Sequence, residues 1–564
     1  MWSKARKRIL VLGGGFGGIY TVRALQKALH GRTDIEIALV NQENYFVFQP
    51  MLAEVISGNI GLLNTVTPIR DMCPGTTLYV RTVEHIDLDN KVVITSHGFR
   101  PEQSVLPYDY LVLALGTLEN FGVVRGLQEH GLHFKNLGDA LALRNRLIHL
   151  LEEADIEQDA ALRRRMLTFV MAGGGFSGVE AIAEVNDFVR DVARRYPHVD
   201  PAELRVILVH AGPRILPELP ASLSRYAQTL LTRRQVEIRL QTRLAAVTAD
   251  EAHLTDGSVL PTKTVIATIG ATPNPVLLAL PCQHERGRLV VNAALEIPEY
   301  PGVWALGDCA HILDHKTGQP CPPTAQYAVR EGTRVARNIV AAIEGTAPRP
   351  FAFSDWGMMS ALGHRAAVGQ VLGIRVSGWP AWVLWRAVYW SKLPGVTRKF
   401  RIALDWLCRL LLPRDYAQLN VSPSERITRE HFEAGAVILH QGDPGDHMYV
   451  MIDGEVEVVQ QQAEGGERVV ATLTQGEWFG EMALFNEEPR GATVRTLTTV
   501  NVLSVDRRTF QTLVTHIAPL REAFERLMQH REAEDTARRQ QHEKEQVVFW
   551  NVEMTAARSA SCLR

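Results

Sequence analysis

The chain has few cysteines and no long hydrophobic run. Its six cysteines are scattered along 564 residues without a C-x-x-C pair, so we expect neither a disulfide framework nor a metal site. This usage is typical of a reducing compartment with free thiols. No apolar stretch reaches the ~20 residues of a membrane-spanning helix, so none is expected. The basic residues 1–8 precede an apolar run that is too short for a signal peptide.

A strong charge of one sign is also missing. The formal net charge is -2 at pH 7, so no global attraction to nucleic acid is expected, and no nucleic-acid partner is predicted. Charged residues make up 22% of the chain and hydrophobic residues 46%, which is ordinary for globular proteins. A chain of this length is too long for one core, so three or four domains are expected.

Glycine gathers in a loop near the start of the chain. Residues 9–12 are apolar, and residues 19–25 have the pattern of a helix. Between them, Gly13, Gly15 and Gly18 fill the three positions of G-x-G-x-x-G, which permit the turn, the approach of a pyrophosphate and the packing of helix on strand. The N-terminus of the helix then directs unpaired N–H groups at the anion.

A second loop of the same kind follows the apolar residues 169–172. Gly173, Gly175 and Gly178 repeat the motif, and residues 179–183 continue as a helix. Because both loops lie between a predicted strand and a predicted helix, they predict two dinucleotide sites. One would hold a flavin dinucleotide and the other a nicotinamide dinucleotide.

The second strand of each unit ends at the position that usually binds a ribose. In the first unit, strand 35–40 is followed by Asn41, whose amide can still bind a ribose hydroxyl. In the second unit, strand 204–209 is followed by His210, which repels a 2′-phosphate less than a carboxylate would. Arg214 is close enough in sequence to attract such a phosphate, so NADPH stays open beside NADH.

Later segments complete the pattern. Strand 108–113 leads to a small-residue turn with Gly116, and a strand motif returns at 303–306, followed by Gly307 and Asp308. Residues 322–326 then lead into a helix predicted over 327–342. This order predicts an α/β fold of two Rossmann-like domains, the first interrupted by the second and completed after it.

The order of these motifs resembles that of type II NADH:quinone oxidoreductases, which are single-chain, non-proton-pumping flavoproteins. The resemblance covers residues 7–415 and rests on G-G-G-F-G-G, F-Q-P-M-L-A-E, L-A-L-G-T, G-G-G-F-S-G-V-E, A-G-P-R-I-L-P, A-L-G-D and P-P-T-A-Q-x-A. It implies FAD at the first glycine loop and NADH at the second. It also implies that a hydride passes from NADH to the flavin and that two electrons then pass to a quinone.

The resemblance also implies roles for single residues. Gln326 would lie at the flavin ring beside the quinone pocket, and Glu180 would face the nicotinamide near the path of hydride and proton. Asp308 would lie on the ribityl and phosphate side of FAD. The cofactor-binding set predicted with it comprises Gly13, Gly15, Phe16, Gly17, Gly18, Asn41, Gly116 and Gly307 for the first domain, and Gly173, Gly175, Phe176, Gly178, His210 and Gly270 for the second.

Two positions depart from the family pattern. Arg330 stands in place of the second Gln of A-Q-x-A-x-Q, and His210 stands where many relatives have Glu. Two alternative functions stay open, of which these departures favour the second. One is a disulfide or sulfide oxidoreductase of the same fold, which would need a cysteine pair at the flavin. The other is a ligand-sensing flavoprotein scaffold without catalysis.

Tryptophan concentrates in residues 377–413, which hold five of the ten in the chain. A helix beginning at 396 would carry one apolar and one charged face, which is typical of a helix lying in the headgroup plane of a membrane. The alternative is a core-packing or dimer-interface helix pair. The apolar face comprises Val396, Phe400, Leu404, Leu407 and Leu411, and the charged face comprises Arg398, Arg401, Asp405 and Arg409.

Short β runs separated by glycines begin near residue 422 and predict a β-roll. Residues 479–493 resemble the phosphate-binding cassette of cyclic-nucleotide-binding domains, over about residues 422–530. Backbone N–H groups near Gly480, Ala483 and Ala492, with Arg490, would hold the phosphate, and Glu481 would accept from the ribose. Gly491 lacks the hydroxyl typical of cGMP-selective relatives, which favours cAMP.

These patterns divide the chain into six predicted segments: 1–160, first part of the FAD domain; 161–285, NAD(P)H domain; 286–345, completion of the FAD domain; 346–415, membrane-docking region; 416–530, cyclic-nucleotide-binding domain; and 531–564, charged tail. The predicted function is that of an NADH:quinone oxidoreductase regulated by a cyclic nucleotide. The predicted location is peripheral, on the cytoplasmic face of the inner membrane. A homodimer is left open.

Overall fold

A computed structural model describes residues 6–96, 104–412, 414–419, 427–443, 445, 447–462, 466–485, 489–507 and 509–510. The predicted charged tail over 531–564, and residues 511–530 of the predicted cyclic-nucleotide-binding domain, lie outside the described residues. The chain divides into two compact units, of which the first extends to Leu419.

The first unit contains a five-stranded parallel sheet with the order β22-β9-β1-β2-β5. Its central strand β1 is fully buried from Ile9 to Leu12, because helices cover both faces of such a sheet. The bounds are β1 (Lys7–Leu12), β2 (Ile35–Asn41), β5 (Thr77–Val80), β9 (Tyr110–Leu113) and β22 (Val303–Ala305).

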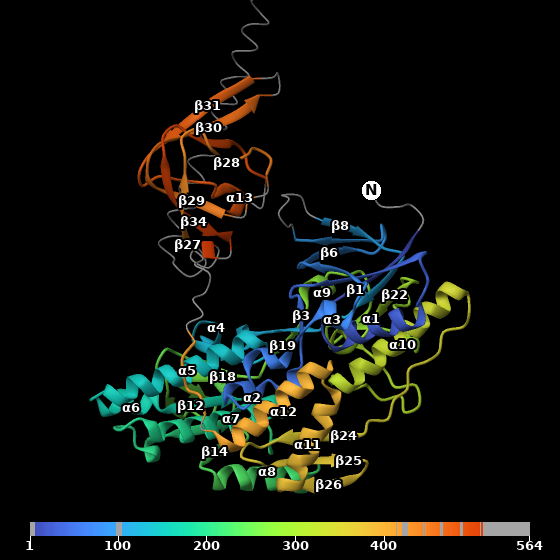
Figure 1. The fold of residues 1–564 in the computed structure, drawn as a ribbon, viewed down its shortest axis with the longest axis vertical. Coiled ribbons are helices and arrows are strands. Elements are labelled where there is room, and N and C mark those ends of the chain that lie inside the picture. The colour runs from blue at the N-terminus through green and yellow to red at the C-terminus, as the bar shows by residue number, and fades with distance from the viewer. Residues whose placement is uncertain are drawn as a thin grey trace, which may run out of the picture. The chain divides into compact units, whose positions relative to one another are not determined.

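The last strand and the last helix of this domain come from residues that follow the second domain in the sequence. Strand β22 pairs with β9, and α10 (Ala325–Glu344) packs across α1 (Phe16–Ala28), as Figure 1 shows. The two helices approach closely, since a Cβ on Gly332 of α10 would lie 2.6 Å from the carbonyl oxygen of Gly17. The predicted interruption of the first Rossmann-like domain is therefore present in the structure.

A second parallel sheet repeats the arrangement with the order β11-β18-β12-β13-β14. Helix α7 (Phe176–Val192) follows β12 as α1 follows β1. The bounds are β11 (Gly131–His133), β12 (Thr168–Ala172), β13 (Arg205–Val209), β14 (Val236–Arg239) and β18 (Thr264–Ala267). The helices beside this sheet include α4 (Leu127–His130), α5 (Leu137–Ile156), α6 (Ala160–Met166) and α8 (Ala221–Arg233).

Small two- and three-stranded sheets connect and edge the two domains. The pair β10 (Thr117–Glu119) and β19 (Ala271–Pro273) joins the segments that leave the two parallel sheets. The others are β3 (Tyr45–Val47) with β4 (Val66–Pro68); β6 (Val83–Asp87), β7 (Val92–Thr95) and β8 (Ser104–Pro107); β15 (Leu244–Val247), β16 (Glu251–Leu254) and β17 (Val259–Pro261); and β20 (His284–Glu285), β21 (Arg288–Val290) and β23 (Ala310–His311). Short helices α2 (Ala53–Ile56), α3 (Ile69–Met72) and α9 (Pro275–Leu278) complete these connections.

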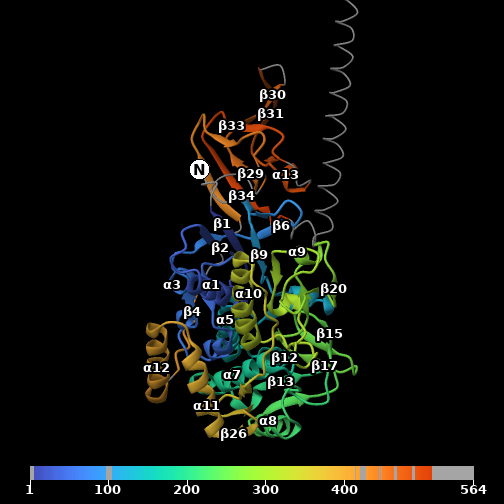
Figure 2. The same cartoon turned by 90° about the vertical axis from the view of Figure 1, so that its right-hand side faces the viewer.

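The first unit ends in a three-stranded sheet and two helices (Figure 2). The strands β24 (Gly357–Ala361), β25 (Ala367–Val371) and β26 (Ile374–Ser377) are antiparallel, and α11 (Gly378–Lys392) and α12 (Val396–Leu411) follow them. Within the described residues, none of the helices combines the length and the apolar character needed to cross a bilayer.

The second unit consists of two four-stranded antiparallel sheets, with the orders β27-β34-β29-β32 and β28-β33-β30-β31. Its apolar core includes Tyr449, Phe479 and Val502. A short helix, α13 (Met482–Phe485), follows β32. The strands are β27 (Ile427–Phe432), β28 (Val437–Leu439), β29 (His447–Asp453), β30 (Val456–Gln462), β31 (Gly466–Leu473), β32 (Trp478–Phe479), β33 (Thr493–Thr496) and β34 (Val500–Asp506). This is the β-roll that the sequence predicted.

Candidate active site

The first glycine loop joins β1 to α1 and leaves open space at its middle glycine. A Cβ on Gly13 (φ +104°) would lie 2.2 Å from the carbonyl oxygen of Ala114. A Cβ on Gly18 would lie 1.8 Å from the carbonyl oxygen of Gly13, so both positions require glycine. At Gly15, by contrast, nothing lies within 4 Å of such an atom. This space at the N-terminus of α1 fits the pyrophosphate of a dinucleotide.

The second loop has the same geometry. A Cβ on Gly173 (φ +122°) would lie 2.3 Å from the hydroxyl of Thr268, and one on Gly178 would lie 1.9 Å from the carbonyl oxygen of Gly173. A Cβ on Gly175 would again have nothing within 4 Å. The chain therefore contains two cradles of one design, each with a strand before it and a helix after it.

The residues that end the second strands both support the loops. The N–H of Gly14 donates to Oδ1 of Asn41 at 2.7 Å, and the N–H of Gly174 donates to Nδ1 of His210 at 3.0 Å. Burial lowers the pKa of His210, which favours the neutral ring that accepts this bond. Both residues thus lie beside the expected ribose position, with a loop N–H as one partner.

Five other predicted cofactor residues surround the cradles. Phe16 begins α1 and packs edge-on against Phe46, with ring centroids 4.9 Å apart. Gly17 lies against Leu306. The remaining three are Phe176, which begins α7, and the positive-φ glycines Gly116 and Gly270, which flank the β10–β19 pair.

Gly307 and Asp308 lie at the turn after β22, beside the carboxylate of Glu331, which the sequence motifs did not predict as a site residue. The N–H of Gly307 donates to the carboxylate of the buried Glu331 on α10 at 2.9 Å. Burial raises the pKa of Glu331 to about 7. Burial also raises the pKa of Asp308, against the attraction of Arg288 and Lys135. Two carboxyl groups are therefore held in a region that disfavours their ionised forms.

The two predicted catalytic residues contact the same short strand. Oε1 of Glu180, one turn into α7, accepts from the N–H of Ala361 at 2.9 Å. Nε2 of Gln326, in the first turn of α10, donates to the carbonyl of Gly357 at 3.0 Å. Ala361 and Gly357 are the two ends of β24, so the two backbone groups that these side chains contact lie about 13 Å apart along the strand.

An aromatic group that the sequence did not single out lies between the first cradle and Glu180. The ring of Tyr389 on α11 packs against Phe48 at 6.3 Å, and Phe48 packs against Phe16 at 5.9 Å. The pKa of Tyr389 is raised by burial and by the nearby Glu180 carboxylate. Tyr389 is therefore held as a neutral phenol close to the predicted catalytic carboxylate.

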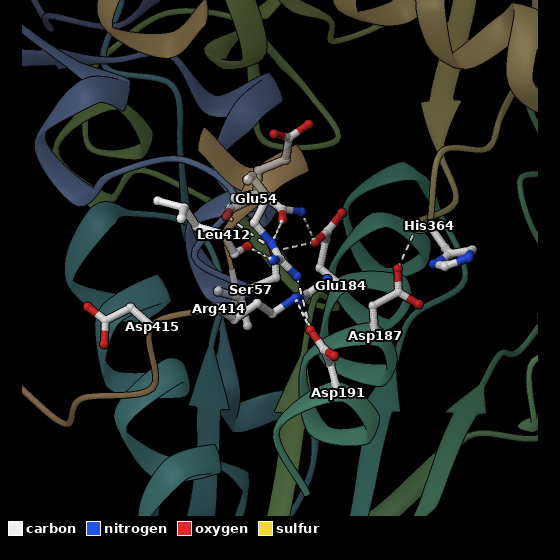
Figure 3. A network of polar contacts seen from close by, with 12 residues as sticks. Glu54, Ser57, Glu184, Asp187, Asp191, His364, Leu412, Arg414 and Asp415 are labelled. Atoms are coloured by element: carbon white, nitrogen blue, oxygen red, sulfur yellow. Dashed lines mark hydrogen bonds and ion pairs between the residues drawn. The ribbon is translucent and has the colours of Figure 1, made fainter. Parts of the chain in front are cut away.

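Glu180 is the first of four acidic residues on one face of α7, and the three that follow it are labelled in Figure 3. Positions four, seven and eleven residues further on share a helix face with the first. Burial raises the pKa of Glu180 to about 8 and that of Glu184 to about 7. The carboxylate of Glu184 raises the pKa of Glu180 further, and that of Asp187 raises the pKa of Glu184 further. The row comprises Glu180, Glu184, Asp187 and Asp191.

Glu184 and its neighbour Glu54 are held by segments distant in sequence. Glu184 accepts from the hydroxyl of Ser57 and from Nδ2 of Asn59 at 2.9 Å. Glu54 accepts from the indole N–H of Trp406 at 2.8 Å, and its pKa is raised to about 7 by burial. The row reaches the surface at Asp191, which pairs with Arg414 at 3.0 Å (Figure 3). Asp191 also pairs with Arg409 at 3.0 Å.

Arg330 lies among aromatic rings one turn after Gln326. Its guanidinium lies 4.1 Å from the ring centroid of Phe353 and 4.8 Å from that of Trp356. Its Nη1 donates to the carbonyl of Gln326 at 3.0 Å. The residue that departs from the family pattern is therefore a cation held beside the predicted flavin contact, and burial lowers its pKa.

Helix α12 presents its apolar face outward and its charged face to the protein. Phe400 is 70% exposed and Leu411 is 77% exposed. On the opposite side, Asp405 accepts from the N–H of Gly61 at 2.9 Å, and Arg409 pairs with Asp191. This is the reverse of the usual orientation of an amphipathic helix on a globular domain.

Not every tryptophan of residues 377–413 faces outward. Trp379 is 62% exposed, whereas Trp385 is buried in the core. Trp382 and Trp406 stack on Arg386, whose guanidinium lies 4.3 Å and 4.2 Å from the two ring centroids. The expectation that tryptophan marks an interface is therefore wrong for Trp385, because its α11 position faces the protein interior.

The predicted cassette residues of the second unit lie together. Gly480 has φ +86°, and the next residue, Glu481, is buried. Buried Arg490 donates to the carbonyls of Gly480 at 2.6 Å and His447 at 2.7 Å. Ala483 is buried on α13, and Ala492 directly precedes β33.

Sequence models of three families match the chain. That of the pyridine nucleotide-disulphide oxidoreductases matches residues 7–332, more than half of the chain, so the two cradles belong to this class of dinucleotide-binding flavoprotein. The NDH2 C-terminal domain matches residues 356–415, and the cyclic nucleotide-binding domain matches residues 429–516.

Similar proteins show which family within this class the chain belongs to. The demethylphylloquinone reductase NdbB of Synechocystis sp. is 33% identical over 417 residues, which are 72% of this chain and 98% of that protein. The type II NADH:quinone oxidoreductase Ndh of Mycobacterium tuberculosis is 28% identical over 76% of this chain and 93% of its own. The chain belongs to the type II NADH:quinone oxidoreductase family. A cyclic nucleotide-binding domain follows the reductase residues in the sequence.

The fold is that of a solved member of this family. The structure of NDH2 from Plasmodium falciparum in complex with NADH matches 73% of this chain and 100% of its own, with a TM-score of 0.68 and 18% identity. The predicted enzyme class, an oxidoreductase, is thus confirmed by family membership.

Proposed function

We propose that this chain oxidises NADH and reduces a quinone, with FAD in the first cradle and NADH in the second. The observation that carries this proposal is the shared attachment of Glu180 and Gln326 to β24, which links a residue of each Rossmann-like domain through one short strand. The open spaces at Gly15 and Gly175 support two bound dinucleotides. The predicted segment boundaries and site residues given above are part of this proposal.

Bound FAD would supply the redox chemistry, by taking a hydride from NADH and passing two electrons to the quinone. The chain's own residues position the reactants and move the remaining proton. The reaction NADH + H⁺ + quinone → NAD⁺ + quinol takes up one proton from the medium. With a pKa raised to about 8, the carboxyl of Glu180 is protonated at neutral pH and can hold that proton. The carbonyl of Gly357 fixes the orientation of the Gln326 amide at the other end of β24.

The test is an anaerobic assay of the flavin colour in the purified chain. We expect NADH to bleach the flavin faster than NADPH does, and a short-chain quinone to restore the colour. Recolouring only by a disulfide or sulfide reaction would support the first alternative function. Absence of bleaching would support the non-catalytic scaffold.

The variant Glu180→Gln tests whether the Glu180 carboxyl supplies the proton. We expect Glu180→Gln to slow the recolouring by quinone about 100-fold, as for loss of a general acid, while the flavin content stays unchanged. The matched control is Glu153→Gln on the exposed side of α5, which should change neither rate. Equal loss of bleaching and recolouring would contradict a role in proton transfer and would indicate a distorted cradle.

We also propose that the segment 377–413 attaches the chain to a membrane surface, from which a quinone dissolved in lipid is reached. The support is the outward apolar face of α12, with Phe400 and Leu411 mostly exposed. The proposed location is the cytoplasmic face of the inner membrane. Phe400→Ser should abolish flotation with lipid vesicles, whereas an unchanged flotation would contradict attachment through α12. A homodimer that covers this face instead would appear as a concentration-dependent dimer that Phe400→Ser dissociates.

The second unit is proposed to bind a cyclic nucleotide, with cAMP favoured, and to change the rate of the reductase. The support is the gathering of Gly480, Glu481 and Arg490 at one place, since a buried guanidinium beside backbone N–H groups suits a phosphodiester. Coupling between sites is typically about 5-fold to 150-fold in affinity. Titration of cAMP and cGMP into the NADH–quinone assay tests it, and an unchanged rate and KM at saturation would refute regulation.

A further inference from the structure

A cavity of about 510 Å³ lies where α12 begins. Helix α1 contributes Arg23 to its lining, α3 contributes Asp71, and the first turns of α12 contribute Thr397, Arg398 and Arg401. Figure 2 shows α12 at the edge of the first unit, beside α3 and β4. Three guanidinium groups against one carboxylate give the lining an excess of positive charge.

Two of these cations contact uncharged groups. Nη1 of Arg398 donates to the carbonyl of Leu63 at 2.7 Å, and the guanidinium of Arg23 lies 5.4 Å from the ring centroid of Tyr20. The pKa of Arg398 is lowered by burial and then by repulsion from Arg401, against a weaker attraction to Asp71. An anion inside the cavity would relieve this repulsion.

The cavity lies beside the outward apolar face of α12. With about 100° between successive residues of a helix, Thr397 and Arg401 lie roughly 60° and 100° from the centre of that face. Leu63, whose carbonyl accepts from Arg398, is itself 65% exposed. Polar groups that can hold a phosphate therefore meet apolar groups that can contact acyl chains.

We propose that this cavity binds the phosphodiester headgroup of an anionic phospholipid while the apolar face of α12 contacts the acyl chains. The proposal rests on the membrane attachment proposed above and adds a specific site to it. Arginine suits the headgroup because its planar fork can donate two hydrogen bonds to one phosphate. A lipid is favoured over a soluble phosphate because the cavity lies at the edge of an apolar surface, as the interface between headgroup and acyl chain does.

The chain offers a matched control for the experiment. A second cavity, also of about 510 Å³, is lined by Arg334, Arg337, Arg349 and Glu344 near the end of α10. Among the described residues, none of the large, exposed hydrophobic side chains comes from residues 325–349. The second cavity therefore resembles the first in size and positive charge but has no exposed apolar surface beside it.

The test compares two double variants that remove the same charge from exposed arginines. Arg23→Gln with Arg401→Gln alters the proposed site, and Arg337→Gln with Arg349→Gln alters the control cavity. The full chain, loaded with flavin, is floated with vesicles of phosphatidylcholine alone and of phosphatidylcholine mixed with phosphatidylglycerol. Flavin content and absorbance report that each variant is folded.

We expect the original chain to prefer the vesicles that contain phosphatidylglycerol. The first double variant should weaken this binding by about 30-fold, as for two basic residues at an anionic surface, and the control by less than about 3-fold. Equal losses in the two double variants would overturn the proposal and would indicate general electrostatic attraction. Saturable binding of glycerol phosphate that leaves vesicle binding unchanged would overturn it too, in favour of a soluble ligand.

A third variant separates failure of this site from failure of membrane attachment. If Phe400→Ser floats as the original chain does, attachment through α12 is wrong and the headgroup site falls with it. If Phe400→Ser loses flotation while the two double variants behave alike, attachment stands and only the headgroup site is refuted. Loss in both Phe400→Ser and the Arg23 and Arg401 double variant, but not in the control, supports both.

Discussion

Replacing Glu184 with glutamine should make the stability of the first unit less dependent on pH. Glu184 is 5% exposed, and burial raises its pKa from 4.5 to about 7. A raised pKa means that the folded chain binds this proton more tightly than the unfolded chain does. The stabilisation from Glu184 is thus complete below about pH 4.5 and is lost as the pH rises through about 7.

The size of the effect follows from the shift. A pKa that differs by about 2.5 units between the folded and unfolded chain corresponds to about 3 kcal/mol in the free energy of unfolding. Glu184→Gln keeps the size of the side chain and one acceptor oxygen for Ser57 and Asn59, but cannot ionise. The free energy of unfolding of the variant, minus that of the original chain, should therefore rise by about 3 kcal/mol from pH 4.5 to pH 7 and then level off.

Urea unfolding of the flavin-loaded chain measures this difference, with release of flavin as the signal for the first unit. Any change in the hydrogen bonds from Ser57 and Asn59 adds an offset that does not depend on pH, so the slope with pH is the quantity of interest. Glu153→Gln, an exposed replacement on α5, should show no slope. A difference for Glu184→Gln that is constant with pH, or that falls as pH rises, would refute the reasoning.

Three further replacements test the nucleotide sites. Gly15→Leu fills the open space of the first cradle and should lower the flavin content of the purified chain at least about 10-fold, because a side chain there excludes the pyrophosphate. Gly175→Leu should leave the flavin in place and raise KM for NADH about 10-fold or more, measured by steady-state kinetics. Arg490→Gln should weaken cAMP binding by about 10-fold to 100-fold in calorimetry, as for loss of a charge-assisted hydrogen bond. Normal flavin content in Gly15→Leu, or unchanged cAMP affinity in Arg490→Gln, would contradict the corresponding site.

The architecture could be predicted because its signals are local. Each glycine loop lies directly between an apolar strand and a helix, and the return of a strand before Gly307 indicates a domain completed later. The helix predicted over 327–342 is α10, Ala325–Glu344. The apolar face of α12 follows from helical spacing alone, and the structure confirms that it is exposed.

The surroundings of the catalytic candidates could not be predicted, because they form between distant segments. Ser57 and Glu184 are 127 residues apart in sequence, and neither position carries a motif of its own. The contact of Glu180 with Ala361 spans 181 residues. The burial of Trp385 could not be predicted either. Composition places this residue in an aromatic-rich segment, and only the packing of α11 shows that it is buried.

The bond between Gly174 and His210 makes the second cradle sensitive to acid in a way that the first is not. Nδ1 of His210 accepts this bond only while it carries no proton, whereas the amide of Asn41, which holds the first loop, does not titrate. Acidification should therefore weaken dinucleotide binding at the second cradle through the loss of this bond. The corresponding bond at the first cradle does not change with pH. If the second cradle holds NADH as proposed, turnover would fall on acidification and recover when the pH returned to neutral.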